Sequence, residues 1–388
     1  MLTNKSGSTL IITVLMIFAA TMGFGSTSLY ASAQNDNEIS SPQTESNQSH
    51  NNPKSNQAEF QKWALFPIIA SSAETGLMLG GMAVRFFKPR SPKMRTNSID
   101  FMAYGSMNQQ YSISVAPNLY FKDELYHLRL SMGGFLWPAN YYGIGNDTST
   151  DDKEKYESKT FVTDLLFERK LKGGIFVGGS YLLKYSDFKA DEDGTLKSGE
   201  IIGSKDGILS GPGIAVTIDT RDNENDARSG SFLTFRSNWF RPAFGSDYTF
   251  EKYDIFLRHF VQLTDTTGLA LGGQVNLTRG DIPFTELNSP DGVTTLRGIE
   301  NGRYRDRDMA GLQTEYRFPI VNRWGGVVFA ETAQVAHELG ELTMDEWKYS
   351  VGTGIRYALN PDERFNFRLD ISFVDGGVGL ALNFREAF

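Results

Sequence analysis

The sequence predicts an all-β fold, a sixteen-stranded antiparallel transmembrane β-barrel, and three observations favour it. Apolar and polar side chains alternate one by one along runs of about ten residues, whereas soluble strands usually end near five or six. An export signal precedes the alternating region. The third observation is that aromatic residues recur near the run ends, as rings do at membrane interfaces: Tyr111, Phe121, Trp239, Phe240, Tyr349 and Phe388. The strands of a soluble sandwich would also alternate, but with their apolar face inside.

The N-terminus reads as a cleaved export signal. Lys5 precedes a short apolar run, LIITVLMIFAA, and the small-residue sequence ASA follows it. The apolar run is shorter than the roughly 20 residues that a membrane-spanning helix needs, so we expect a signal peptide over 1–33. Residues 34–60 contain almost no apolar side chain, which predicts a disordered polar linker. The barrel is therefore expected over 61–388.

Composition excludes several classes of function. The net charge of −8 argues against a nucleic-acid partner, because nucleic acid requires a basic face. The absence of cysteine excludes a disulfide framework, thiol chemistry and a lipid-modified N-terminal cysteine. The four histidines, His50, His127, His259 and His337, lie far apart without zinc-ligand spacing, so no metal and no other cofactor is expected.

Sixteen segments fit the alternating pattern, and the connections between them sort by length. The connections assigned to the outer side include the longest, near 135–155, 186–209 and 281–308. None of those assigned to the periplasmic side exceeds about ten residues. Short periplasmic turns and longer outer loops are typical of bacterial barrels, so both termini are expected in the periplasm. The first two segments and the thirteenth alternate poorly. The segments are 63–71, 75–87, 96–106, 110–121, 124–134, 156–170, 173–185, 210–219, 230–240, 250–262, 267–280, 309–320, 325–336, 347–358, 364–374 and 377–388.

The loop expected between the eleventh and twelfth strands is dense in charge. Its last part, LRGIENGRYRDRD at 296–308, holds four arginines, one glutamate and two aspartates. Such a charge run is usually a solvated surface loop. The alternative is that the loop folds back into a polar lumen, where arginine suits bidentate pairing with carboxylates. The expected inner wall is charged, with Glu315, Arg317, Arg356, Arg368 and Asp370 facing the lumen. These charges would be explained either by the general polarity of a lumen or by specific pairing with the loop.

Short motifs spread over nearly the whole barrel region resemble those of a known family. In this order and spacing the set is similar to the BamA/TamA-type outer-membrane proteins, the bacterial surface antigen family, whose barrels have sixteen strands. The motifs are YYGIGNDT (141–148), TIDTRDN (217–223) with the following Ser229-Gly230, GDIPF (280–284), LRGI (296–299), TEYRFPI (314–320), GTGIRY (352–357), FRLD (367–370) and the terminal Phe388.

The resemblance implies a role for the charged loop. In that family a loop with an Arg-Gly pair tucks into the lumen, and its arginine engages acidic residues of the inner wall. Arg297 and Gly298 take those positions as a lumen loop latch, and Ile299 stands where the family has an aromatic residue. Glu331 stands for the aspartate of a Phe-x-Asp-x-Gly pattern, and Ala333 replaces the glycine. The candidate inner-wall partners are Glu315, Arg317, Glu331, Arg368 and Asp370.

Two further motifs lie at the expected periplasmic side. Asp219, Arg221 and Asp222 lack the alternating carboxylates and late glutamate of a calcium loop, which favours a structured periplasmic turn. The last strand ends with Phe384 and Phe388 on one face, which resembles the signal by which the barrel assembly machinery recognises its clients. Glu386, between them, departs from the usual apolar residue.

The resemblance implies a barrel of the cell outer membrane of a Gram-negative bacterium that assists insertion or translocation of proteins or lipids. Expected partners are outer-membrane lipid and lipopolysaccharide, the barrel assembly machinery, and a protein or lipid substrate. A linker of about 25 residues is too short for a further domain, and no G-x-S-x-G motif is present, so a barrel-only, non-enzymatic member is expected. The alternatives are a loop-plugged passive pore for small solutes and a structural surface antigen. Pro67 removes one backbone donor from the first strand, which fits a weakly paired edge or a bulge.

Overall fold

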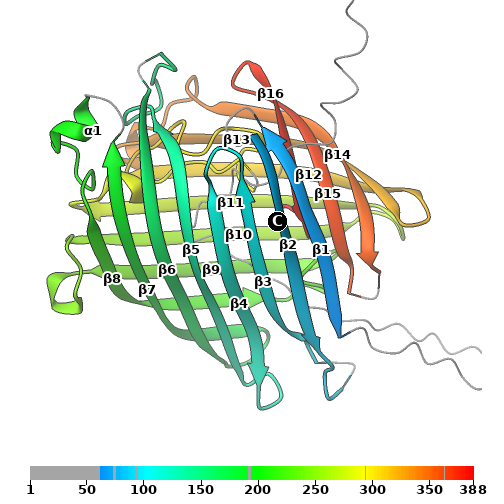
Figure 1. The fold of residues 1–388 in the computed structure, drawn as a ribbon. Coiled ribbons are helices and arrows are strands. Elements are labelled where there is room, and N and C mark those ends of the chain that lie inside the picture. Colours follow the sequence, from blue (N-terminus) through cyan, green and yellow to red (C-terminus); the bar gives the residue numbers. More distant parts are fainter. Residues whose placement is uncertain are drawn as a thin grey trace, which may run out of the picture.

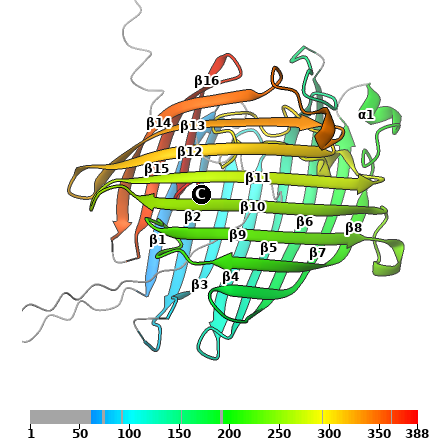
Figure 2. The ribbon, with the colours of Figure 1, turned by 180° about the vertical axis from the view of Figure 1, so that it is seen from behind.

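Sixteen antiparallel strands form one sheet whose order follows the sequence from β1 to β16. This computed structural model describes residues 62–388, apart from 73–75, 92–93, 152, 191–193, 293 and 362. The sheet curls into a barrel (Figures 1 and 2), which confirms the predicted fold class. The expected signal peptide, 1–33, and linker, 34–60, lie outside the described residues.

The elements agree closely with the expected segments. The strands are β1 (Trp63–Ser72), β2 (Gly76–Phe87), β3 (Asn97–Ser106), β4 (Tyr111–Phe121), β5 (Tyr126–Tyr141), β6 (Glu154–Lys170), β7 (Ile175–Ala190), β8 (Gly207–Asp219), β9 (Gly230–Phe240), β10 (Phe250–Gln262), β11 (Gly268–Gly280), β12 (Asp308–Val321), β13 (Trp324–Ala336), β14 (Lys348–Asn360), β15 (Phe365–Val374) and β16 (Gly377–Phe384). The short helices are α1 (Thr195–Ser198), η2 (Pro242–Phe244), η3 (Phe284–Glu286) and η4 (Leu339–Glu341). None of the helices in this part of the chain is long and apolar enough to cross a membrane.

The connections lie at two ends of the barrel. Those that follow even-numbered strands lie where β1 begins and β16 ends, which we call the termini end. Those that follow odd-numbered strands, including the loop 281–307, lie at the opposite end, which we call the long-loop end. This arrangement follows from an antiparallel sheet in sequence order.

Three strand boundaries differ from the prediction by at least four residues. β5 continues to Tyr141 and β7 to Ala190, because both pair with β6 beyond the predicted ends, as in the pair Tyr141 and Glu154. Pro138, in the extension of β5, is a residue that sequence alone assigns to a loop. β16 ends at Phe384 instead of 388, because the chain turns at Arg385, whose φ is +64°.

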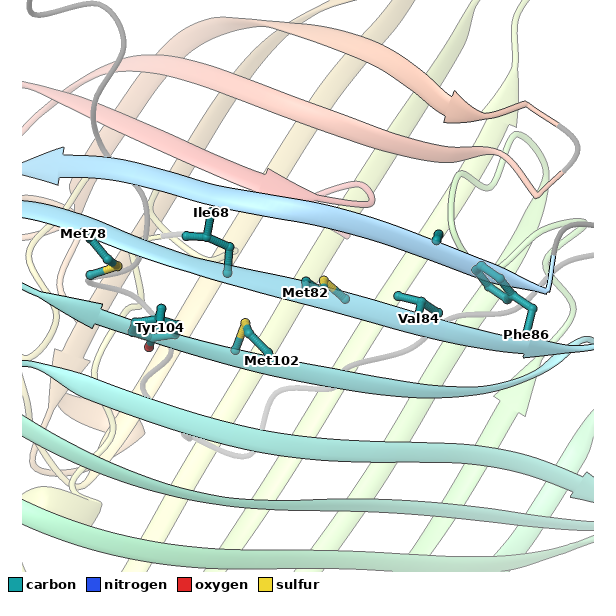
Figure 3. Close-up of a cluster of buried hydrophobic side chains, with 8 residues drawn as sticks. Ile68, Met78, Met82, Val84, Phe86, Met102 and Tyr104 are labelled. Atoms are coloured by element: carbon teal, nitrogen blue, oxygen red, sulfur yellow. The ribbon is translucent and has the colours of Figure 1, made fainter.

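The two faces of the sheet differ in polarity. On β12, Glu315 is buried toward the lumen, while Leu312 is 58% exposed on the outer wall. Large apolar side chains exposed along an outer wall indicate contact with lipid. β1 and β2 are an exception, because their inner faces are apolar as well, with Met102 and Tyr104 of β3 beside them. This explains why the first two strands alternate poorly. Figure 3 labels seven of these inner residues: Ile68, Met78, Met82, Val84, Phe86, Met102 and Tyr104.

The two ends of the sheet meet at a seam. β1 pairs only with β2 and β16 only with β15, and no backbone hydrogen bond joins β1 to β16 among the residues the structure describes. Aromatic rings cross the seam instead. The ring centroid of Phe66 lies 4.8 Å from that of Phe384 and 5.4 Å from that of Phe365. Pro67, next to Phe66, has no N–H to donate along this edge.

Candidate functional site in the lumen

The loop 281–307 folds into the barrel from the long-loop end, where Figure 2 shows it in yellow within the ring of strands. Apolar side chains fix it to the inner wall. Leu296, Ile299 and Tyr304 are buried in a cluster with side chains of β12, β13 and β15. Ile299 therefore supplies an apolar contact at the position where the family pattern has an aromatic residue.

Arg297 is the centre of the site. Its side chain is 0% exposed, and its Nε donates to Oε1 of Glu331 at 2.7 Å. Its Nη1 donates to Oε2 of Glu315 at 2.7 Å and to Oδ2 of Asp370 at 3.0 Å. The backbone N–H of Arg297 also donates to Glu331, at 2.6 Å. One arginine thus joins carboxylates from β12, β13 and β15, and these charge-assisted bonds are the stronger kind.

Other wall residues complete the seat of Arg297. Its guanidinium lies 3.3 Å from the ring centroid of Phe329, which shares the inner face of β13 with Glu331. Its carbonyl oxygen accepts hydrogen bonds from the hydroxyls of Ser350 and Ser372, each at 2.7 Å. The sequence analysis did not single out Phe329, Ser350 or Ser372. Their inward position in the period-two pattern was the available signal.

The two remaining expected partners contact Arg297 only indirectly. Arg317 and Arg368 do not contact Arg297 but pair with its carboxylates. Arg317 bonds Glu315 at 2.8 Å, and Arg368 lies 3.4 Å from Asp370. Arg356 bridges the same two carboxylates and reaches Glu386 at 2.6 Å. The wall is therefore a connected network of ion pairs.

Gly298 brings the loop into backbone contact with the last strand. Its φ is +88°, a conformation that favours glycine. A Cβ placed there would lie 2.3 Å from Oγ of Ser372 and 2.7 Å from Cα of Gly379. The latch thus touches β16, whose other edge faces the seam.

A second anchor holds the start of the loop on the opposite wall. Glu286 of η3 is buried and accepts a hydrogen bond from Nζ of Lys184 on β7 at 2.7 Å, while Nζ of Lys252 on β10 lies 3.7 Å away. Burial acts to raise the pKa of Glu286, but the two ammonium groups outweigh it and hold that pKa below its ordinary value. The loop is therefore tied to both walls.

Glu286→Gln is expected to lower the free energy of unfolding by about 1–3 kcal/mol at pH 7, because the half-buried Lys184 and the buried Lys252 lose their anion. Since the folded pKa of Glu286 is depressed, its contribution is complete above the ordinary glutamate pKa of about 4.3 and is lost as pH falls through the folded pKa. Urea unfolding of both proteins from pH 3 to 7 measures this. The exposed Glu200→Gln is the control, and a difference that does not shrink in acid contradicts the assignment.

The motif after β8 forms a turn with bonds of its own. Arg221 makes two bonds to Asp219, at 2.9 and 2.8 Å, and Asp222 accepts the backbone N–H groups of Arg228 and Ser229. Burial works to lower the pKa of Arg221, but Asp219 outweighs it and raises that pKa. No group of three or more histidine, cysteine or acidic side chains that could hold a metal ion occurs in the described part of the chain.

This turn also crosses the lumen at the termini end. On one side Glu224 pairs with Arg95 at 2.6 Å, and on the other Asp226 pairs with Arg317 at 3.1 Å. Asn225 donates to the carbonyl of Glu363 in the turn between β14 and β15. The lumen is therefore bridged near both of its ends.

Phe388 does not lie where the sequence placed it. Phe384 is on β16, but Phe388 has left the strand and is buried inside the barrel against Phe260 and Ala270. The turn at Arg385 redirects the chain, and Nη2 of Arg317 donates to the backbone oxygen of Phe388 at 3.0 Å. The prediction that both rings share one face of the last strand is wrong for the folded chain.

Comparisons with known proteins agree with this architecture. Residues 95–374 match the model of the Omp85 superfamily domain. BamA from Haemophilus ducreyi lacking POTRA domains 1–3 superposes with a TM-score of 0.56 at 11% identity, over 84% of this chain and 70% of that chain. CdiB from Acinetobacter baumannii gives 0.54 at 12% identity, over 81% and 56%, and CdiB from Escherichia coli gives 0.53 at 9%, over 83% and 61%. No curated protein matches the sequence.

Proposed function

Since the chain belongs to the Omp85 superfamily, we propose that this outer-membrane barrel assists the insertion or translocation of proteins or lipids across its seam. The observation that carries the proposal is the contact between the lumen latch and the last strand. Arg297 and Gly298 fix the loop to β12 through β16, so the loop braces one side of an edge that has no strand partner across the seam in the described structure.

The seam supports an entry route for an apolar strand. Among the described residues, no strand pairing joins β1 to β16, so the backbone N–H and C=O groups on their facing edges have no strand partner. Such edges accept a further strand. The inner faces of β1 and β2 are apolar, so a strand entering there would meet apolar side chains on the lumen side as well as on the lipid side. We assign the termini end to the periplasm, because its turns are the shorter ones.

The plugged lumen argues against a passive pore. The loop 281–307 is tied to both walls, and the turn 220–229 bridges the termini end. A buried ion pair such as Arg297 with Glu331 is costly to open, because the separated charges lose their partners. We expect low steady conductance from the wild-type barrel.

Closing the seam covalently is expected to abolish insertion. The chain has no cysteine, so Phe66→Cys/Phe384→Cys introduces the only two thiols, at rings that are 4.8 Å apart. Liposomes holding this variant, treated with a short reducible cross-linker, receive an unfolded outer-membrane barrel protein. The measured quantity is the rate at which that client becomes heat-modifiable, and it should fall to the rate of empty liposomes.

The matched control is the same sample after reduction, which should recover the uncross-linked rate. If cross-linked and reduced barrels accelerate folding equally, the seam is not the route. If wild type accelerates nothing and conducts steadily, the protein is a pore.

A further inference from the structure

Cations gather at one corner of the barrel, where β1, β2 and β4 reach the termini end. We call Lys62, Arg85, Lys88, Arg90 and Lys122 the basic corner. None of the five lies within ion-pair distance of a carboxylate in the part of the chain that the structure describes. The nearby acid Glu124 is already bonded by Lys170 at 2.9 Å and by the backbone N–H of Arg95 at 2.6 Å.

Arg85 points away from the lumen, toward the membrane. It shares the outer face of β2 with Phe87, and its guanidinium lies 5.2 Å from the ring centroid of Trp63 and 5.4 Å from that of Phe87. Trp63 is 48% exposed on the same wall. Aromatic rings beside a cation at the strand ends mark the level of the lipid headgroups.

A cavity of about 260 Å³ lies beside these rings, between the β2–β3 loop and the β4–β5 turn. Lys88, Arg90 and Lys122 line it together with Phe87 and Phe121. The one acidic residue on its lining, Asp123, is exposed, and Arg95 on the same lining is neutralised by Glu224. The cavity therefore presents an excess of positive charge and suits an anion.

An apolar groove lies farther along β2 on the outer wall. It measures about 770 Å³, and small residues hollow it out, among them Gly81 and Ala83 of β2 and Ala103 of β3. The larger side chains of Leu65 and Phe161 stand at its sides. Ala83 and Phe87 share one face of β2, so about 13 Å of strand separates the groove from the corner at a rise of roughly 3.3 Å per residue.

We propose that the basic corner and this groove together hold one anionic glycerophospholipid. Arg85 and Lys88 bind its phosphate, because guanidinium and ammonium groups are the donors that phosphate selects. One acyl chain runs up β2 into the groove. The occupant is a lipid because the groove opens to the lipid-facing wall, and its phosphate is selected because the corner carries uncompensated positive charge. The lipid would cover β2, the strand that holds β1 at the seam.

Native mass spectrometry of the purified full-length barrel, exchanged into detergent with phosphatidylglycerol or phosphatidylcholine, tests the site. Wild type should retain one phosphatidylglycerol and much less phosphatidylcholine. Arg85→Gln/Lys88→Gln should retain phosphatidylglycerol at least about tenfold less, because both charge-assisted contacts to the phosphate are lost. The control Lys172→Gln/Arg323→Gln removes two exposed cations from other turns at the same end and should bind as wild type does.

Heat-modifiable mobility first establishes that both variants fold. Equal retention by wild type and Arg85→Gln/Lys88→Gln overturns the proposal. Equal retention of the two lipids means that the corner does not select a net negative headgroup, which overturns it as well. Displacement of the lipid by glycerol 3-phosphate at similar concentration would make the corner a site for free phosphate instead. None of these outcomes depends on whether the barrel inserts other proteins.

Discussion

Arg297→Ala is expected to release the loop 281–307 from the inner wall and to lower the free energy of unfolding by about 3–5 kcal/mol, as for a broken buried ion pair. The loss is unequal among the carboxylates. Glu315 and Asp370 keep Arg356, whereas Glu331 pairs with no other cation among the described residues. Glu331 therefore bears most of the cost.

Two measurements check this expectation. The midpoint of heat-modifiable gel mobility should fall, and single-channel conductance should rise because the lumen loses its plug. Arg323→Ala, in the exposed turn between β12 and β13, is the matched control and should change neither quantity. Wild-type conductance and midpoint in Arg297→Ala would show that the latch neither plugs nor stabilises the barrel.

A second substitution separates the charge effect from the loss of packing. Arg297→Met/Glu331→Gln removes the unpaired carboxylate and should recover part of the stability, because neutral groups of similar volume replace a buried pair at small cost. Conductance should stay high, since the loop has still lost its contacts with Glu315 and Asp370. The non-additivity of the two changes measures the coupling between Arg297 and Glu331.

The strands could be predicted from the sequence because a barrel wall has two solvents. Lipid outside and a polar lumen inside impose strict alternation, as in β15, where Phe367 and Leu369 flank Arg368. The prediction of strands is less accurate where the two faces of a strand do not differ in polarity. β1 and β2 are apolar on both faces, and the end of β5 pairs with β6 beyond the expected end of the strand.

The acidic partners of Arg297 could also be anticipated, because Glu315 and Asp370 occupy inward positions of their strands. The redirected C-terminus could not. Whether Phe388 continues β16 or enters the lumen depends on tertiary contacts with Arg317 and Phe260, which lie far away in the sequence. Local alternation contains no information about such contacts. The same holds for the turn 220–229, whose motif was evident but whose span across the lumen was not.

Gly379→Ala is expected to detach the latch from the last strand without touching any charge. A Cβ on Gly379 would lie 2.3 Å from Cα and 2.8 Å from the carbonyl oxygen of Gly298, and neither backbone atom can rotate away. Forcing this contact open should cost about 1–3 kcal/mol, as overpacking does elsewhere. Gly298→Ala would be a less clear test, since its φ of +88° adds strain of its own.

Gly377→Ala is the matched control, because a Cβ there meets its nearest neighbour, the carbonyl oxygen of Val374, at an ordinary 3.7 Å. Gly379→Ala should change both the rate at which a protease cleaves the loop and the client-folding rate. Gly377→Ala should change neither rate. If both substitutions behave alike, the contact between Gly298 and Gly379 is incidental. If Gly379→Ala alters client folding while Arg297 stays protected, the brace on β16 acts separately from the plug. Seam and lumen would then be controlled by two different parts of one loop.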